Sequence, residues 1–330
     1  MIRVTADPTT LDDTAPAPAP GAGASAATPA GHELVVEGLR AGYPGHLAVR
    51  GVDLTVPAGR VVAVVGPNGC GKSTLLRAVA RLHKPESGRV RVGDADIWQL
   101  KQRQAAHRVA LLPQSPQPPE AVTVAGLVRY GRHPHQGLFR QWSREDERAV
   151  REALEATGVA ALAGRRLDQL SGGQRQRCWL AMVLAQETPV VLLDEPTSAL
   201  DMGHAVEVLE LTREVAAAGR TVVMVLHDLA SAARYADTLV AMNDGLVVAS
   251  GAPRDIVDAQ LVKELYGVDA DILPAPGDGS PVVVPAARTA TDRPGTDRGQ
   301  PDADRGQAGT DRGRAGTDRG RAGTDRGRAG

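Results

Sequence analysis

The sequence predicts an α/β fold in which helices cover both faces of a parallel β-sheet. Three runs carry this expectation, at residues 61–65, 190–193 and 221–226, because each is apolar almost throughout. Strands buried on both faces have this pattern, whereas strands of a half-exposed sheet alternate between apolar and polar residues. Short β-like segments precede the first run, and helical patterns lie between the first and the second. We therefore expect a parallel core with an antiparallel β portion and a helical subdomain.

The expected elements can be placed along the chain. Residues 34–36, 52–56 and 88–92 are the strands expected around the first apolar run, and residues 109–112 form another short apolar strand. Ser143 has the character of a helix N-cap, because acidic residues occupy the first turn after it and apolar residues recur on one face.

The helical subdomain is expected over about residues 116–178. A second helix is expected after Gln174, near the end of this region. The chain then returns to strands, and the Asn-Asp-Gly turn within residues 242–246 lies between two apolar runs, as in a β-hairpin.

Three segments differ in composition. Residues 1–31 are rich in proline, alanine and glycine and are expected to form a disordered arm. Residues 32–275 contain the expected folded domain. Residues 276–330 are expected to form a C-terminal extension, and it ends in three copies of Gly-Thr-Asp-Arg-Gly-Arg-Ala. These repeats have no apolar residue larger than alanine and cannot build a core, so we expect them to be disordered.

Composition excludes several classes of protein. The formal net charge of the 330 residues is −1, so we expect no nucleic-acid partner. The two cysteines, Cys70 and Cys178, have no Cys-x-x-Cys spacing, which favours a reducing compartment. The sequence has no run of about 18 apolar residues and no basic-then-apolar start, so we expect a cytoplasmic location.

Residues 66–74 match the phosphate-binding loop G-x-x-x-x-G-K-[ST] in the strand–loop–helix setting that it requires. Glycines allow a sharp bend that points backbone N–H groups at a polyphosphate. Lys72 supplies a point charge for the β- and γ-phosphates, and the Ser73 hydroxyl can ligate Mg²⁺. We therefore expect ATP and Mg²⁺ as cofactors. The expected nucleotide contacts are Gly66, Pro67, Asn68, Gly69, Cys70, Gly71, Lys72, Ser73 and Thr74.

Two carboxylates follow the apolar run at residues 190–193. Asp194 is expected to hold Mg²⁺, and Glu195 is expected to act as the general base that polarises an attacking water. An ordinary acidic turn is the alternative reading. The phosphate-binding loop upstream favours the catalytic one.

A second anion site is expected at the start of a helix. Ser171 and the glycines after it offer a hydroxyl and bare N–H groups at a positive helix end. A simple Ser-Gly cap is the alternative. The expected contacts are Ser171, Gly172, Gly173 and Gln174.

The string Leu-Ser-Gly-Gly-Gln-Arg-Gln-Arg at residues 170–177 resembles the signature of ATP-binding cassette (ABC) ATPases. The resemblance extends from about residue 34 to residue 281. It is strongest to the ATP-binding subunits of ferric siderophore, haem and cobalamin importers. The segments that carry this finer resemblance are 130–137, 184–189 and 225–237.

The resemblance implies roles for further residues. Tyr43 matches the aromatic residue that stacks on adenine. Gln114 matches the glutamine that contacts Mg²⁺ or the attacking water and reports to the transport partner. Asp201 lies in the segment that crosses to a second subunit, and His227 matches the histidine that contacts the γ-phosphate.

The resemblance also implies an assembly. Two copies would form a head-to-tail homodimer that holds ATP between Lys72, Ser73 and Asp194 of one copy and Ser171 and Gly173 of the other. The implied partners are separate integral-membrane permease subunits and, indirectly, an extracytoplasmic substrate-binding protein. The implied location is the cytoplasmic face of the cell membrane, and the implied reaction is ATP hydrolysis coupled to import, most simply of ferric siderophores.

Other classes of nucleotide-binding protein have different sequence features. A soluble ABC protein that acts in translation or DNA repair usually has two cassettes or a long coiled coil, and this sequence has one cassette and no heptads. A P-loop kinase or RecA-like motor lacks a string like residues 170–177. A purely regulatory binder needs a defective Lys72 or Glu195, and both are intact. Import of cobalamin, haem or a metal ion is the main alternative, and export is less favoured.

Overall fold

A six-stranded, mainly parallel sheet forms the centre of the molecule. The computed structural model describes residues 32–117, 121–137, 142–198 and 200–286. Five neighbouring strands of this sheet run parallel, and the sixth joins its edge as an antiparallel hairpin. The order across the sheet is β10 (Leu246–Gly251), β9 (Thr238–Asn243), β3 (Val61–Val65), β8 (Thr221–Val225), β7 (Val190–Asp194) and β6 (Val109–Leu112).

The continuous apolar runs have a direct structural cause. In β3, Val61, Ala63 and Val65 belong to one buried cluster. The alternate residues Val62 and Val64 belong to a second cluster on the other face. Both faces of the central strands are therefore covered, as the sequence predicts.

An antiparallel sheet packs over one face of the central sheet, with helix α1 (Lys72–Val79) in the same hydrophobic cluster. The predicted strands at residues 34–36, 52–56 and 88–92 all lie in this sheet, and the first two are longer than predicted. The order is β2 (His46–Val56), β1 (Leu34–Tyr43), β4 (Ser87–Val92) and β5 (Ala95–Asp96).

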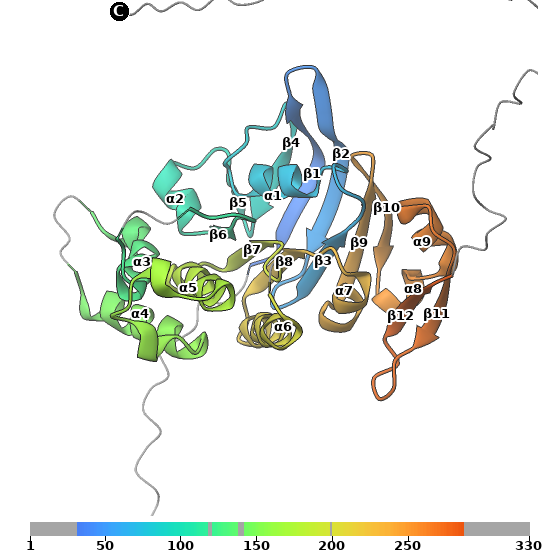
Figure 1. Cartoon of the computed structure of the whole chain (residues 1–330). Helices are drawn as coiled ribbons and strands as arrows, with labels where there is room; N and C mark the ends of the chain where they lie inside the picture. The colour runs from blue at the N-terminus through green and yellow to red at the C-terminus, as the bar shows by residue number, and fades with distance from the viewer. Residues whose placement is uncertain (1–31, 118–120, 138–141, 199, 287–330) are drawn as a thin grey trace, which may run out of the picture. The chain divides into compact units, whose positions relative to one another are not determined.

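Helices α3 (Val124–Tyr130), α4 (Arg144–Ala156) and α5 (Gly172–Ala185) pack together beside the β6 edge of the central sheet (Figure 1). Ser143 caps α4, as predicted, and its hydroxyl accepts a hydrogen bond from the Asp146 amide. The helix expected after Gln174 begins two residues earlier, because the Ser171 hydroxyl caps it by accepting from the Gln174 amide. Short elements complete this part of the chain: α2 (Gln102–Ala106) and the 3-10 turns η1 (His133–His135), η2 (Ala160–Leu162) and η3 (Leu167–Gln169).

The predicted hairpin forms between β9 and β10. It turns at Asp244 and Gly245, which both have positive φ, as two-residue hairpin turns commonly do. A second hairpin was not anticipated: its last strand covers residues 281–285, past the predicted boundary at 275. The remaining elements are α6 (Met202–Ala217), α7 (Leu229–Tyr235), α8 (Pro253–Ile256), α9 (Ala259–Tyr266), β11 (Ala270–Pro274) and β12 (Pro281–Pro285).

The predicted arm at residues 1–31 and the repeats beyond residue 286 lie outside the described residues. Within the described part of the chain, none of the helices combines the length and the apolar character that crossing a membrane requires.

Candidate functional site

A cavity of about 430 Å³ opens where the phosphate-binding loop meets the carboxyl ends of β7 and β8. It gathers predicted residues from segments far apart in the sequence. His46 and Ala48, which come from β2, were not anticipated, because they belong to no recognisable motif. The cavity is lined by Tyr43, His46, Ala48, Asn68, Gly69, Gly71, Lys72, Ser73, Thr74, Gln114, Glu195 and His227.

Two glycines of the loop cannot be exchanged for a larger residue without a clash. Gly66 has φ 146°, and a Cβ placed on it would lie 2.0 Å from the Met242 carbonyl oxygen. Gly71 has φ 104°, and its Cβ would lie 2.1 Å from the Ala48 carbonyl oxygen. The loop therefore fits tightly against β9 and β2, and this fit keeps its backbone in the bent conformation.

Lys72 and Ser73 begin α1 just after the loop. The Lys72 ammonium is buried and donates hydrogen bonds to the Gly66 and Pro67 carbonyl oxygens, each at 2.8 Å. Its positive charge therefore lies within the curve of the loop, where phosphate oxygens would bind. The free thiol of Cys70, a predicted contact, is buried 3.8 Å from the Lys72 Nζ, and Cys70 does not line the cavity.

Ser73, which lines the cavity, forms an oxygen-rich pair with the buried Asp194. The Ser73 hydroxyl donates to the Asp194 carboxylate at 3.0 Å. Burial raises the pKa of Asp194 above its ordinary value, although the hydrogen bond from Ser73 opposes this. Hydroxyl and carboxylate oxygens are the ligands that Mg²⁺ prefers, so the pair fits that ion.

Both carboxylate oxygens of Glu195 are occupied by predicted site residues. Gln114 Nε2 donates to Oε2 at 2.6 Å, and His227 Nε2 lies 2.6 Å from Oε1. Glu195 is 7% exposed and has φ 54°. A non-glycine residue in this conformation is strained. The two partners fix the direction of the carboxylate.

Tyr43 lies at the mouth of the cavity and is 44% exposed. Its hydroxyl accepts a hydrogen bond from Arg77 at 3.4 Å, and its ring lies 4.7 Å from the ring of His83. One face of the ring is therefore supported by the protein, which leaves an aromatic surface available for a base to stack on.

The other predicted contacts do not line this cavity. The side chain of Ser171 and that of Gln174 close a capping box at the start of α5, and Ser171 is exposed. Asp201 caps α6 by accepting a hydrogen bond from the His204 amide at 3.0 Å. A Cβ on Gly173 would lie 3.3 Å from His204, so these two helix starts are neighbours.

We expect that Gly71→Ala weakens ATP binding at least ~10-fold, because the new methyl group meets backbone at 2.1 Å and the loop must shift. Equilibrium titration with a fluorescent ATP analogue measures this. Gly38→Ala is the matched control: Gly38 also has positive φ, 53°, but its Cβ meets nothing within 4 Å. Equal ATP affinity in the two variants would contradict the tight fit.

Comparisons with known proteins identify the family to which the chain belongs. The sequence profile of a family described as ABC transporter matches residues 49–198. The ferric enterobactin transport ATP-binding protein of Escherichia coli (strain K12) is 47% identical over 255 residues, which are 77% of this chain and 94% of that protein. The hemin import ATP-binding protein of Streptomyces coelicolor (strain ATCC BAA-471 / A3(2) / M145) is 46% identical, over 75% of this chain and 88% of that protein. Among solved structures, a bacterial ABC transporter cassette in a dimeric structure superposes with a TM-score of 0.61 at 26% identity, covering 66% of this chain and 98% of that one.

Proposed function

The chain belongs to the ATP-binding subunits of ABC transporters, and we propose that it powers import of ferric siderophores through a separate membrane permease. One observation carries the ATPase part of this proposal. The phosphate-binding loop, Ser73 and Glu195 line a single cavity, and Asp194 accepts a hydrogen bond from Ser73 at 3.0 Å. Phosphoryl transfer to water requires this combination of phosphate binding, charge stabilisation and a positioned base.

The residues of the cavity take separate roles. Lys72 and the loop amides bind the phosphates, and the exposed ring of Tyr43 stacks on the adenine. Glu195 accepts a proton from the attacking water, and Gln114 and His227 orient its carboxylate through their contacts of 2.6 Å. While those contacts persist, both oxygens of Glu195 are engaged. Each oxygen keeps a second lone pair, so the attacking water can still donate to the oriented carboxylate.

Ser73 and Asp194 would hold Mg²⁺, because both present oxygen ligands beside the loop. Gln114 is the third predicted ligand, and its side chain lines the same cavity. When bound, the ion would neutralise charge on the phosphate oxygens during transfer.

The positions of Ser171 and Asp201 support a head-to-tail homodimer. Both residues cap helix starts and are exposed, and neither lines the cavity of its own chain. A second copy would present them to the phosphates bound by the first, so ATP would close the dimer and hydrolysis would open it. A relative of this fold was solved as a dimer.

The names of the relatives support a ferric siderophore as the transported cargo. Several are named for siderophores or their iron complexes, including enterobactin, achromobactin and petrobactin, at 46–47% identity. Permease subunits and an extracytoplasmic substrate-binding protein are the partners that import requires. The chain would then lie at the cytoplasmic face of the cell membrane. The relative named for hemin, at 46% identity, favours haem as the second candidate cargo.

Uptake assays test the cargo. We expect that deleting the chain from its host abolishes ATP-dependent uptake of labelled ferric siderophores, and that the restored wild-type chain pulls down an integral-membrane protein. Lys72→Ala, which removes the charge from the loop, should fail to restore uptake. Lost uptake of labelled hemin or cobalamin with unchanged siderophore uptake would reassign the cargo. Unchanged uptake of all three would refute an import function.

A further inference from the structure

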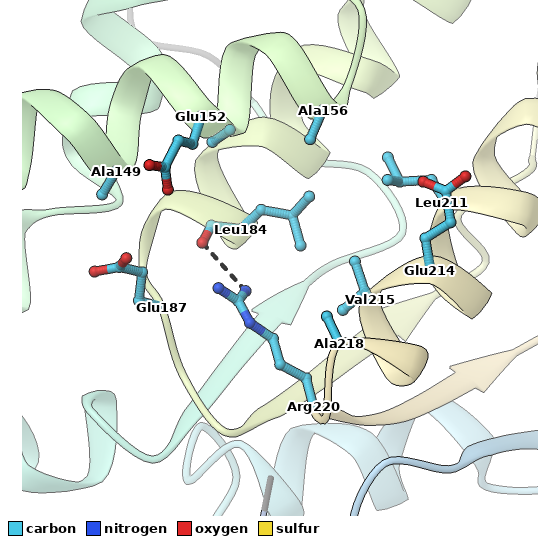
Figure 2. Close-up of a pocket in the computed structure, with 11 residues that line it drawn as sticks. Ala149, Glu152, Ala156, Leu184, Glu187, Leu211, Glu214, Val215, Ala218 and Arg220 are labelled. Atoms are coloured by element: carbon cyan, nitrogen blue, oxygen red, sulfur yellow. Dashed lines mark hydrogen bonds between the residues drawn. The ribbon is translucent and has the colours of Figure 1, made fainter. Parts of the chain in front are cut away.

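A groove lies between the helical part of the chain and α6, and it shares no residue with the nucleotide cavity. It consists of two adjoining cavities of about 230 Å³ each, which have Ala156, Leu211 and Glu214 in common. Figure 2 shows Ala149, Glu152 and Ala156 of α4 on one side and Leu211, Glu214 and Val215 of α6 on the other, with Arg220 between them.

The groove and the catalytic residues lie at opposite ends of β7 and β8. Arg220 directly precedes β8 and Glu187 precedes β7, so the groove lies at the amino ends of these strands. Glu195 and His227 follow the carboxyl ends of the same strands. A molecule bound in the groove would touch α6 and the carboxyl end of α5. The predicted contacts Ser171 and Asp201 lie at the amino ends of α5 and α6, respectively.

Negative charge dominates the groove. Its lining has two guanidinium groups and five carboxylates, Glu152, Glu187, Glu207, Glu210 and Glu214. Two arginines outside the lining, Arg132 and Arg148, also neutralise part of this charge. Three of the carboxylates pair with arginines. Glu210 and Glu214, one turn apart on exposed positions of α6, have no ion pair within the described part of the chain. Like charges at this spacing repel each other, so a cation between them would be stabilised.

Arg220 gives the groove a directed hydrogen-bond donor. The residue is 9% exposed, and its Nη1 donates to the Leu184 carbonyl oxygen at 3.2 Å (Figure 2). Its Nε and Nη2 make no hydrogen bond to any described residue. These two nitrogens are not fully buried, so they can donate to a ligand that enters the groove. Burial also lowers the pKa of Arg220, and Glu187 opposes this shift.

We propose that this groove is a docking site for an extended, arginine- or lysine-rich segment of another protein. The cationic side chains would reach Glu210 and Glu214 on one wall and Glu152 on the other. A backbone carbonyl of the segment would accept from Arg220. Small side chains would lie against the alanines of the groove, Ala149, Ala153 and Ala156 among them.

The alternative ligand chemistries fit less well. An anionic segment could pair with Arg220, but the excess of carboxylates around it would repel the remaining charges. A purely apolar helix would strip water from Glu210 and Glu214 without pairing them, which costs free energy. The cationic segment satisfies the carboxylates and Arg220 together. Because it would bridge α5 and α6, its binding would fix the helical part of the chain against the core.

Fluorescence anisotropy with the full chain tests this proposal. The probe is a labelled short peptide of alternating arginine, alanine and glycine, and its counterpart has glutamate in place of arginine. We expect saturable binding of the arginine peptide that weakens as salt is raised, and no binding of the glutamate peptide. Glu214→Lys should raise the Kd about 10-fold, because it replaces an attraction by a repulsion.

Two further variants separate the groove from general attraction to a charged surface. Ala218→Trp fills the groove from an exposed position without changing charge, and it should weaken binding about 10-fold or more. Glu155→Lys reverses a carboxylate of α4 that does not line the groove, and it should bind as wild type. Thermal melts confirm folding of each variant. Wild-type affinity in Ala218→Trp, equal loss in Glu155→Lys and Glu214→Lys, or preference for the glutamate peptide would each overturn the proposal.

Discussion

Replacing Glu195 by glutamine is expected to lower ATP turnover about 10²- to 10³-fold while ATP binding persists. Glutamine has nearly the same shape and can still contact Gln114 and His227, which lie 2.6 Å from the carboxylate oxygens. It has no basic oxygen that can accept a proton from water. The loop, Lys72 and the Ser73–Asp194 pair are untouched, so the phosphates should bind as before.

Two measurements separate these effects. Phosphate release gives the turnover rate, and size-exclusion chromatography with ATP gives the fraction of dimer. The hydrolysis-deficient variant should accumulate as an ATP-bound dimer, whereas the wild-type chain should dissociate as it turns over. Glu155→Gln, at an exposed position of α4 outside the cavity, should behave as wild type in both assays. Near-normal turnover in Glu195→Gln would remove Glu195 as the base.

The sequence predicts those features that depend on residues close together along the chain. The bend of the phosphate loop needs glycine at Gly66 and Gly71, and the backbone contacts at 2.0 and 2.1 Å show why. The cap of α4 at Ser143 is equally local, because the partner Asp146 is three residues away. The central strands could be placed because burial on both faces demands a continuous apolar run.

Features that depend on distant pairing could not be predicted. The contacts of Glu195 with Gln114 and His227 require β6, β7 and β8 to be neighbours in one sheet, and a single sequence does not specify that order. His46 and Ala48 reach the cavity only because β2 folds over the loop. The hairpin of β11 and β12 could not be predicted, because β12 is short and begins and ends with proline, a residue that is unusual within strands.

A buried ion cluster links α4 and α5 in the helical part of the chain. Arg132, which is 3% exposed, lies 2.9 Å from the fully buried Asp146 and 2.7 Å from Glu187. It also donates to the Ala185 carbonyl oxygen at 2.8 Å, so it ties the end of α5 to the start of α4. Arg132→Ala is expected to reduce the free energy of unfolding by about 3–5 kcal/mol, because it leaves the Asp146 charge buried and unpaired.

The pH dependence of this loss provides a second test. Burial alone raises the pKa of Asp146, but hydrogen bonds from Arg132 and Ser143 outweigh burial and hold the pKa below its ordinary value. In the wild-type chain Asp146 therefore stabilises the fold above the unfolded pKa of about 4 and ceases to do so as the pH falls through the folded pKa. Without Arg132, burial raises the folded pKa. The loss in free energy of unfolding caused by Arg132→Ala should therefore be largest at pH 7. It should become smaller toward about pH 4, where the buried carboxyl is protonated.

Urea unfolding of matched variants at the two pH values measures the effect. Arg148→Ala is the control, because Arg148 is 27% exposed and pairs with Glu152 and Glu187 near the surface. Its removal should cost less than about 1 kcal/mol. The double variant Arg132→Met with Asp146→Asn should recover part of the loss, because no charge then remains buried without a partner. A loss in Arg132→Ala that matches Arg148→Ala, or one that does not change with pH, would show that the buried pair does not hold the helical part together.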